Sequence, residues 1–76
     1  MTPLRSGATI GILGGGQLGR MLASAGAQLG FDMLIYSPED DPPAGRVAAG
    51  AWSAAWDDVD ALREFAGACD AVTLEF

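Results

Sequence analysis

A glycine-rich segment is the clearest candidate for binding chemistry in this sequence. Residues 14–19 read Gly-Gly-Gly-Gln-Leu-Gly and satisfy the spacing G-x-G-x-x-G. They follow an apolar run and precede a segment of helical periodicity, which is the context in which such loops bind phosphate at a helix start. Gly14 permits a tight turn, Gly16 allows a ligand to approach the backbone, and Gly19 allows the helix to pack on the strand. The alternative is that these glycines only form the turn.

A carboxylate follows the last apolar run, Ala71 to Leu74, as Glu75. In a doubly wound sheet the fourth strand lies beside the first, and ligands bind at the carboxyl ends of these two strands. We therefore expect Glu75 close to the glycine-rich segment. Because like charges repel, it would accept hydrogen bonds from an amine or hydroxyl of the ligand and not contact a phosphate. A solvated carboxylate is the alternative.

A dinucleotide is the usual ligand of such a loop, but the second apolar run does not favour one. NAD-binding domains carry an acidic residue at the end of that strand, and this sequence has Ser37 there with no arginine nearby for NADP. An NAD(P)-binding Rossmann domain of an oxidoreductase stays an alternative. A non-catalytic interaction fragment, which would pair through an exposed sheet edge, is another.

Composition excludes several classes of function. The net charge of −6 arises from four arginines and ten acidic residues, so a basic face for nucleic acid is not expected. The chain has no histidine, and its one cysteine, Cys69, rules out an internal disulfide or a thiolate metal cluster. No apolar stretch approaches the ~20 residues of a membrane span, and no signal peptide is recognisable. We expect a cytoplasmic protein.

Strand and helix patterns alternate along the chain. Apolar runs and periodic segments predict, in order, a strand at 8–13, a helix at 17–29, a strand at 31–36, a short helix at 43–48, a strand at 51–53, a helix from 57 or 58 to 66 and a strand at 71–74. This order predicts an α/β fold, a Rossmann-like parallel sheet of about four strands with crossover helices in three layers. Residues 1–76 are expected to form a single partial domain of a longer protein.

The helical periodicities also predict which side chains are buried. In the first helix the expected buried face consists of Leu18, Met21, Leu22, Ala25 and Leu29. A second stripe of small residues, Gly19, Ala23 and Gly26, would allow a close approach to the sheet. In the later helix the expected buried face is Val59, Leu62 and Phe65 with Ala66.

Four further side chains have both a functional and a structural interpretation. Arg20 could steer an anion, although a solvated position is favoured because the helix dipole opposes a positive charge there. Trp52 and Trp56 could stack on a base but are favoured as core or domain-interface residues. Cys69 is favoured as a buried structural thiol, since the chain has no histidine to activate it.

Several segments together resemble one enzyme family. Residues 10–23 read I-G-I-L-G-G-G-Q-L-G-R-M-L-A, residues 43–48 match P-A-x-x-V-A, residues 57–62 match D-D-x-x-x-L, and residues 69–76 match C-D-V-V-T-x-E-F. These segments are similar to the start of the 5-(carboxyamino)imidazole ribonucleotide synthases, a family of ATP-grasp ligases. Ser37, where the family often has aspartate, and residues 50–56 depart from the pattern.

The resemblance implies a fold and an activity for the longer protein. The fold would be an amino-terminal Rossmann-like pre-ATP-grasp domain, followed by a central and an ATP-grasp domain absent from this chain. The activity would be the carboxylation of aminoimidazole ribonucleotide with bicarbonate, which ATP first converts to carboxyphosphate, in purine biosynthesis. By the same resemblance, ATP and Mg²⁺ would bind to the absent domains, and a homodimer is compatible with the family.

The resemblance also implies which residues bind the substrate. They are Gly14, Gly15, Gly16, Gln17 and Leu18 at the loop and Glu75 after the last strand. No catalytic residue is expected in this segment, and it is not expected to be catalytic alone.

Overall fold

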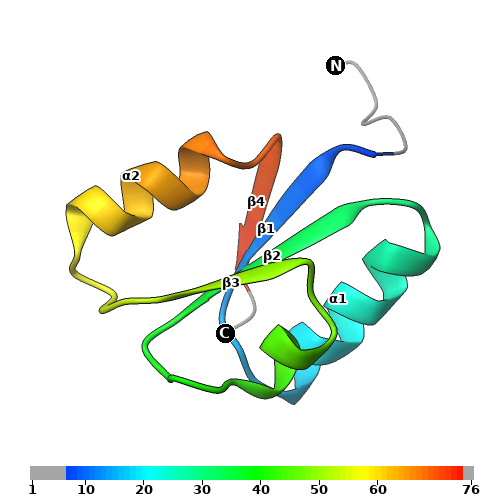
Figure 1. The fold of residues 1–76 in the computed structure, drawn as a ribbon, viewed down its shortest axis with the longest axis horizontal. Coiled ribbons are helices and arrows are strands. Elements are labelled where there is room, and N and C mark those ends of the chain that lie inside the picture. Colours follow the sequence, from blue (N-terminus) through cyan, green and yellow to red (C-terminus); the bar gives the residue numbers. More distant parts are fainter. Residues whose placement is uncertain (1–6, 75–76) are drawn as a thin grey trace.

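The computed structural model describes residues 7–74 and contains one four-stranded parallel sheet (Figure 1). In chain order the elements are β1 (Thr9–Leu13), α1 (Gln17–Gln28), β2 (Asp32–Ser37), the 3-10 helix η1 (Pro43–Arg46), β3 (Gly50–Ser53), α2 (Val59–Gly67) and β4 (Ala71–Leu74). The strand order is β3-β2-β1-β4. The predicted α/β alternation and the return of the last strand to the side of the first are confirmed.

The sheet register brings the carboxyl ends of the two central strands and β4 together. Leu13 at the end of β1 pairs with Tyr36 on one side and with Leu74 on the other. The chain leaves β1 at Gly14, directly after this position. The glycine-rich segment therefore begins between the ends of β2 and β4, as the topology predicted.

The face of the sheet that α1 covers holds the main apolar core. Alternate residues of the central strands point to this face and pack with small residues of α1 and η1, and the cluster consists of Ile12, Ala23, Met33, Ile35 and Ala44. A Cβ atom added to Gly26 of α1 would overlap the Sδ atom of Met33. The helix axis can lie this close to the sheet only because the contacting positions have little or no side chain.

The opposite face of the sheet is covered by α2, so the molecule has three layers (Figure 1). Phe65 of α2 is buried and contacts the ring of Tyr36 from β2, with centroids 5.4 Å apart. A Cβ atom added to Gly11 of β1 would lie 2.7 Å from an edge carbon of the Phe65 ring. Glycine at this position therefore admits the aromatic ring to the sheet surface.

The predicted buried face of α1 is wrong. Met21 is 68% exposed and Leu29 is 70% exposed, and the other predicted positions, Leu18, Leu22 and Ala25, are also exposed. The buried residues are Gly19, Ala23 and Gly26, the stripe that was predicted to allow close approach. Close packing over this stripe turns the larger apolar side chains away from the sheet.

The later helices differ from the prediction in detail. In α2, Phe65 is buried and Leu62 is half-buried, but Val59 and Ala66 are exposed. The predicted cap is confirmed, because the Asp58 carboxylate accepts a hydrogen bond of 3.0 Å from the amide of Ala61. The predicted short helix from residue 43 to 48 is a 3-10 turn that ends at Arg46, a length typical of such turns.

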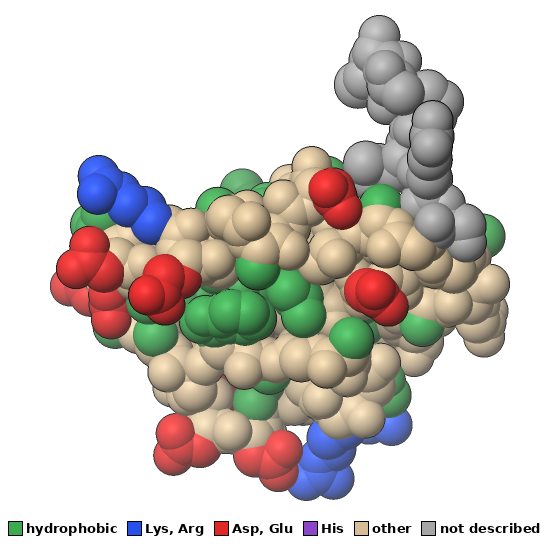
Figure 2. Space-filling view, turned by 45° about the horizontal axis from the view of Figure 1, so that its top comes forward, with side chains coloured by type: hydrophobic (Ala, Val, Ile, Leu, Met, Phe, Trp, Pro, Cys, Tyr) green, Lys and Arg blue, Asp and Glu red, His purple; other side chains and the backbone are tan. Residues whose placement is uncertain are grey.

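The surface carries mainly negative charge, in keeping with the net charge of −6. Figure 2 shows acidic side chains spread over the displayed face and basic side chains only at two of its ends, so that face has no continuous basic patch. Within residues 7–74, every helix is too short or too polar to cross a bilayer.

Candidate functional site

The first two glycines of the loop form a buried turn. Gly14 has a φ of 131°, a conformation that side chains other than glycine rarely adopt, and its amide donates a 2.9 Å hydrogen bond to the carbonyl of Tyr36. Gly14 and Gly15 are both buried. The predicted tight turn at Gly14 is therefore confirmed, and the loop is tied to the end of β2.

The next residues form the accessible start of α1. Gly16 is the half-buried N-cap of the helix and supplies no side-chain hydrogen bond. Helical hydrogen bonding begins with the amide of Arg20, which donates to the carbonyl of Gly16 at 2.9 Å. The preceding amides, those of residues 17–19, have no acceptor among the described residues. Free amides and the positive end of the helix dipole together favour an anion at this turn.

The two side chains after Gly16 are open to solvent. Gln17 and Leu18 are both exposed, whereas Gly19 is buried. Its burial is what the role predicted for Gly19, close packing of the helix, requires. The exposed part of the predicted binding segment is thus confined to Gly16, Gln17 and Leu18.

The predicted acidic residue, Glu75, lies outside the described residues. The strand that leads to it is described, and its last residue, Leu74, pairs with Leu13 immediately before the glycine turn. The topological basis for expecting an acid beside the turn is therefore present. The role of Glu75 itself stays a prediction.

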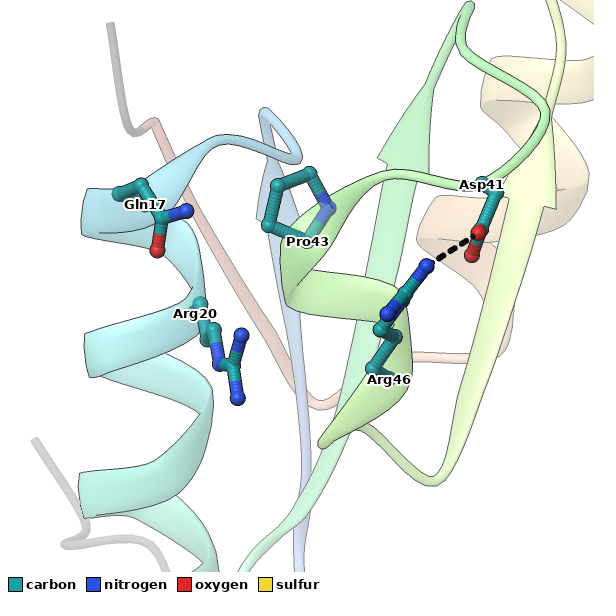
Figure 3. Close-up of a pocket in the computed structure, with 5 residues that line it drawn as sticks. All are labelled: Gln17, Arg20, Asp41, Pro43 and Arg46. Atoms are coloured by element: carbon teal, nitrogen blue, oxygen red, sulfur yellow. Dashed lines mark hydrogen bonds and ion pairs between the residues drawn. The ribbon is translucent and has the colours of Figure 1, made fainter.

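A hollow of about 170 Å³ lies between α1 and η1 (Figure 3). Its lining consists of Gln17, Arg20, Asp41, Pro43 and Arg46. Arg46 donates a 2.8 Å hydrogen bond to the Asp41 carboxylate, and this ion pair lowers the pKa of Asp41. Sequence reasoning had assigned neither Asp41 nor Arg46 to a site, because only the packing of η1 against α1 brings them near Gln17.

Ser37 at the end of β2 is buried, and its hydroxyl is hydrogen-bonded to the backbone. Its Oγ atom accepts a 3.2 Å hydrogen bond from the amide of Glu39. Only 3% of the residue is exposed, so it is not available to a ribose hydroxyl. The position at which NAD-binding domains place an acid is thus part of the protein interior.

Four aromatic residues, Tyr36, Trp52, Trp56 and Phe65, form a cluster on the α2 side of the sheet. Tyr36 contacts Trp56 at 5.6 Å between ring centroids, and Trp52 contacts Phe65 at 5.3 Å. The Tyr36 hydroxyl donates a 2.6 Å hydrogen bond to the carbonyl of Ala55. Burial raises the pKa of Tyr36, and the carboxylates of Asp58 and Asp57, just before α2, raise it further. Both tryptophans are therefore packing residues in this structure.

Cys69 is a half-buried thiol whose Sγ atom donates to the carbonyl of Phe65 at 3.1 Å. Burial raises its pKa, and the neighbouring Asp70 adds to that effect. A raised pKa keeps the sulfur protonated at neutral pH, so it is a poor nucleophile. The structural interpretation of Cys69 is supported.

Within residues 7–74, no group of three or more acidic or cysteine side chains is placed so that it could hold a metal ion. The four basic residues of the sequence are all arginine.

Comparison with known proteins gives consistent matches over nearly the whole chain. The family model of the ribonucleotide synthetase pre-ATP-grasp domain matches residues 7–76. The N5-carboxyaminoimidazole ribonucleotide synthase of Brucella melitensis is 52% identical over 75 residues, which cover 99% of this chain and 21% of that protein. The chain thus spans about a fifth of the length of the curated relatives that it matches.

Solved structures of the same enzymes share the fold. The Staphylococcus aureus N5-carboxyaminoimidazole synthetase complexed with ADP has a TM-score of 0.93 and 42% identity, over 96% of this chain and 20% of that one. The Aspergillus clavatus enzyme in complex with ADP and 5-aminoimidazole ribonucleotide has a TM-score of 0.82 and 34% identity, over 93% of this chain and 19% of that one. The chain belongs to the ribonucleotide synthetase pre-ATP-grasp domain family and matches the amino-terminal part of the N5-carboxyaminoimidazole ribonucleotide synthases.

Proposed function

We propose that this chain is the ribonucleotide-binding part of an ATP-dependent ligase that carboxylates aminoimidazole ribonucleotide with bicarbonate. The observation that carries the proposal is the accessible start of α1, where the amides after the half-buried Gly16 have no acceptor among the described residues. One relative with this fold was solved in complex with 5-aminoimidazole ribonucleotide. A phosphate on a small ribonucleotide is the ligand that such a turn suits.

Within this proposal the loop residues have two tasks. Gly14 and Gly15 are buried and shape the turn. Gly16, Gln17 and Leu18 are accessible and contact the phosphate and sugar of the ribonucleotide. Glu75 follows β4 and accepts a hydrogen bond from the amine or a hydroxyl of the same ligand. In this arrangement the carboxylate does not contact the phosphate, because the two negative charges would repel each other.

ATP and Mg²⁺ belong to a different part of the longer protein in this proposal, because the described residues offer neither lysine nor a metal-binding group. ATP supplies the phosphoryl group that activates bicarbonate. The present chain orients the ribonucleotide so that its amine can attack the activated carboxyl group, and positioning of this kind contributes to rate through proximity. Residues 1–76 then form one partial domain of a cytoplasmic enzyme.

A chimeric enzyme tests the proposal. This chain would replace the aligned 75 residues of the Brucella melitensis synthase, with which it is 52% identical. We expect ATP hydrolysis that depends on aminoimidazole ribonucleotide. Glu75→Gln should lower kcat/KM for the ribonucleotide about ten- to hundredfold, the usual effect of losing a charged hydrogen bond.

Glu64→Gln is the matched control, because Glu64 is exposed on α2 and is given no role in binding. It should leave both kinetic constants unchanged. A folded chimera without ribonucleotide-dependent hydrolysis would contradict the proposal. Equal kinetics for Glu75→Gln and Glu64→Gln would remove Glu75 from the site.

A further inference from the structure

The segment Pro42–Ala44, at the start of η1, packs directly on the glycine turn. The amide of Ala44 donates a 3.0 Å hydrogen bond to the carbonyl of Gly15. Pro42 is buried, and a Cβ atom added to Gly15 would overlap the Cβ atom of Pro42. Gly15 has no positive φ, so glycine is required at this position by close contact and not by backbone conformation.

Contacts on both sides hold this segment in place. Before it, the Ser37 Oγ atom accepts from the amide of Glu39, and the Ser53 hydroxyl of β3 donates to the Glu39 carbonyl at 3.1 Å. After it, Arg46 pairs with Asp41 across the turn at 2.8 Å (Figure 3). Ala44 is itself fully buried in the core. The segment is therefore a fixed part of the fold and serves as a rigid support for the loop.

The glycine turn is consequently held from two directions. Gly14 donates its amide to the end of β2, and Gly15 accepts at its carbonyl from Ala44. Both residues are buried, and the next one, Gly16, is the first with partial exposure. The orientation of the amides that follow Gly16 is set by these two attachments. A turn fixed in advance loses less conformational entropy when a ligand binds.

The same segment and the end of β2 both approach Gly15 closely. In dinucleotide-binding domains the ribose next to the glycine loop is held by a residue at the end of the second strand. Here that residue is Ser37, which is buried. A Cβ atom added to Gly15 would lie 3.0 Å from the Cβ atom of Ser37. Pro42, which is also buried, approaches Gly15 from the same side as Ser37. Among the described residues of the glycine turn, Gly16, Gln17 and Leu18 are those with exposed surface.

We propose that Pro42 and Ala44 are positioning residues for the phosphate-binding turn, and that their segment restricts the site to a ligand with one phosphoribosyl group. The inference rests on the proposed function and adds the reason why a dinucleotide is rejected. It also explains why three consecutive glycines are present. Gly14 makes the turn, Gly15 accommodates Pro42, and Gly16 faces the ligand.

Calorimetric titration of the chimeric synthase described above, with aminoimidazole ribonucleotide and with NADH, tests this inference. Pro42→Gly should raise the dissociation constant for the ribonucleotide about tenfold, because the turn is no longer held in advance. Hydrogen exchange of the Ala44 amide should accelerate in the same variant. Pro38→Gly is the matched control, since Pro38 is an exposed proline of the same loop, and it should change neither quantity.

Each outcome bears on the inference. Ribonucleotide binding that is equal in wild type and Pro42→Gly, with faster exchange at Ala44, overturns the positioning role alone. Micromolar binding of NADH that aminoimidazole ribonucleotide displaces from the chimera overturns the restriction to one phosphoribosyl group. A folded chimera with the wild-type segment that binds no ribonucleotide overturns the proposed function and this inference with it. Should Pro42→Gly fail to fold, Gly15→Ala tests the same packing, because its Cβ atom would overlap that of Pro42. We expect weaker ribonucleotide binding, and a folded Gly15→Ala variant with unchanged affinity overturns the positioning role.

Discussion

The glycines of the loop are required for different physical reasons. Gly14 has a positive φ, which other residues rarely adopt, and Gly19 is buried in α1. Gly15 has no positive φ, but a Cβ atom there would overlap the Cβ atom of Pro42, which lies beyond β2 in the sequence.

Titration of the Tyr36 side chain should make the free energy of unfolding depend on pH. Its phenol has a pKa raised by burial and by the carboxylates of Asp58 and Asp57. Between the unfolded pKa of about 10 and the higher folded pKa, the folded state keeps a proton that the unfolded state has released. The free energy of unfolding should therefore fall as the pH rises above about 10, and Tyr36→Phe should remove part of that fall.

Urea denaturation of wild type and Tyr36→Phe at pH values from about 8 to about 11 measures the difference between their declines in stability. The lowest pH lies below the titration of the phenol. The Cys69 thiol, whose pKa is also raised, is present in both proteins and cancels in the comparison. Parallel declines in wild type and Tyr36→Phe would show that the phenol does not titrate differently in the folded state.

The first helix shows how element packing can override a hydrophobic pattern. Its apolar side chains have ideal helical spacing, yet Met21 and Leu22 are exposed and the stripe of Gly19, Ala23 and Gly26 is buried. The pattern correctly predicted a helix, but two stripes competed for the sheet. Close backbone approach over the small residues determined the outcome, since Met33 fills the space at Gly26.

Two substitutions in α1 distinguish these packing faces. Gly26→Ala should lower the free energy of unfolding by about 1 kcal/mol, because overpacking against buried Met33 costs ~1–3 kcal/mol and the gain in helix propensity returns only about 1. Met21→Ala truncates a larger side chain that is 68% exposed, and its effect should stay within about 0.5 kcal/mol. Chemical denaturation measures both values. The reverse ranking would mean that α1 packs through its larger apolar residues.

At the scale of the whole molecule, the order of elements predicted the topology. Alternating strands and helices imply parallel strands with crossover connections, and the observed order β3-β2-β1-β4 follows. That topology places the end of β4, at Leu74, beside the start of the glycine turn. The hollow between α1 and η1 was not predictable, because it arises where two separately predicted elements meet.

The carboxyl ends of β1, β2 and β4 meet at one end of the sheet, and α1 begins there with amides that have no acceptor among the described residues. The Brucella melitensis and Staphylococcus aureus relatives are about five times as long as this chain. In the function proposed above, this end of the sheet holds and orients the ribonucleotide.

Titration of the isotopically labelled 76-residue chain with aminoimidazole ribonucleotide, followed by the amide resonances in its NMR spectrum, tests the proposed binding region. We expect saturable shifts at the amides of Gly16, Gln17 and Leu18, with inorganic phosphate shifting the same amides at higher concentration. The buried attachment point at Ala44 should shift little. Saturable shifts confined to residues remote from the glycine turn, or no shifts at any ribonucleotide concentration, would contradict the central claim.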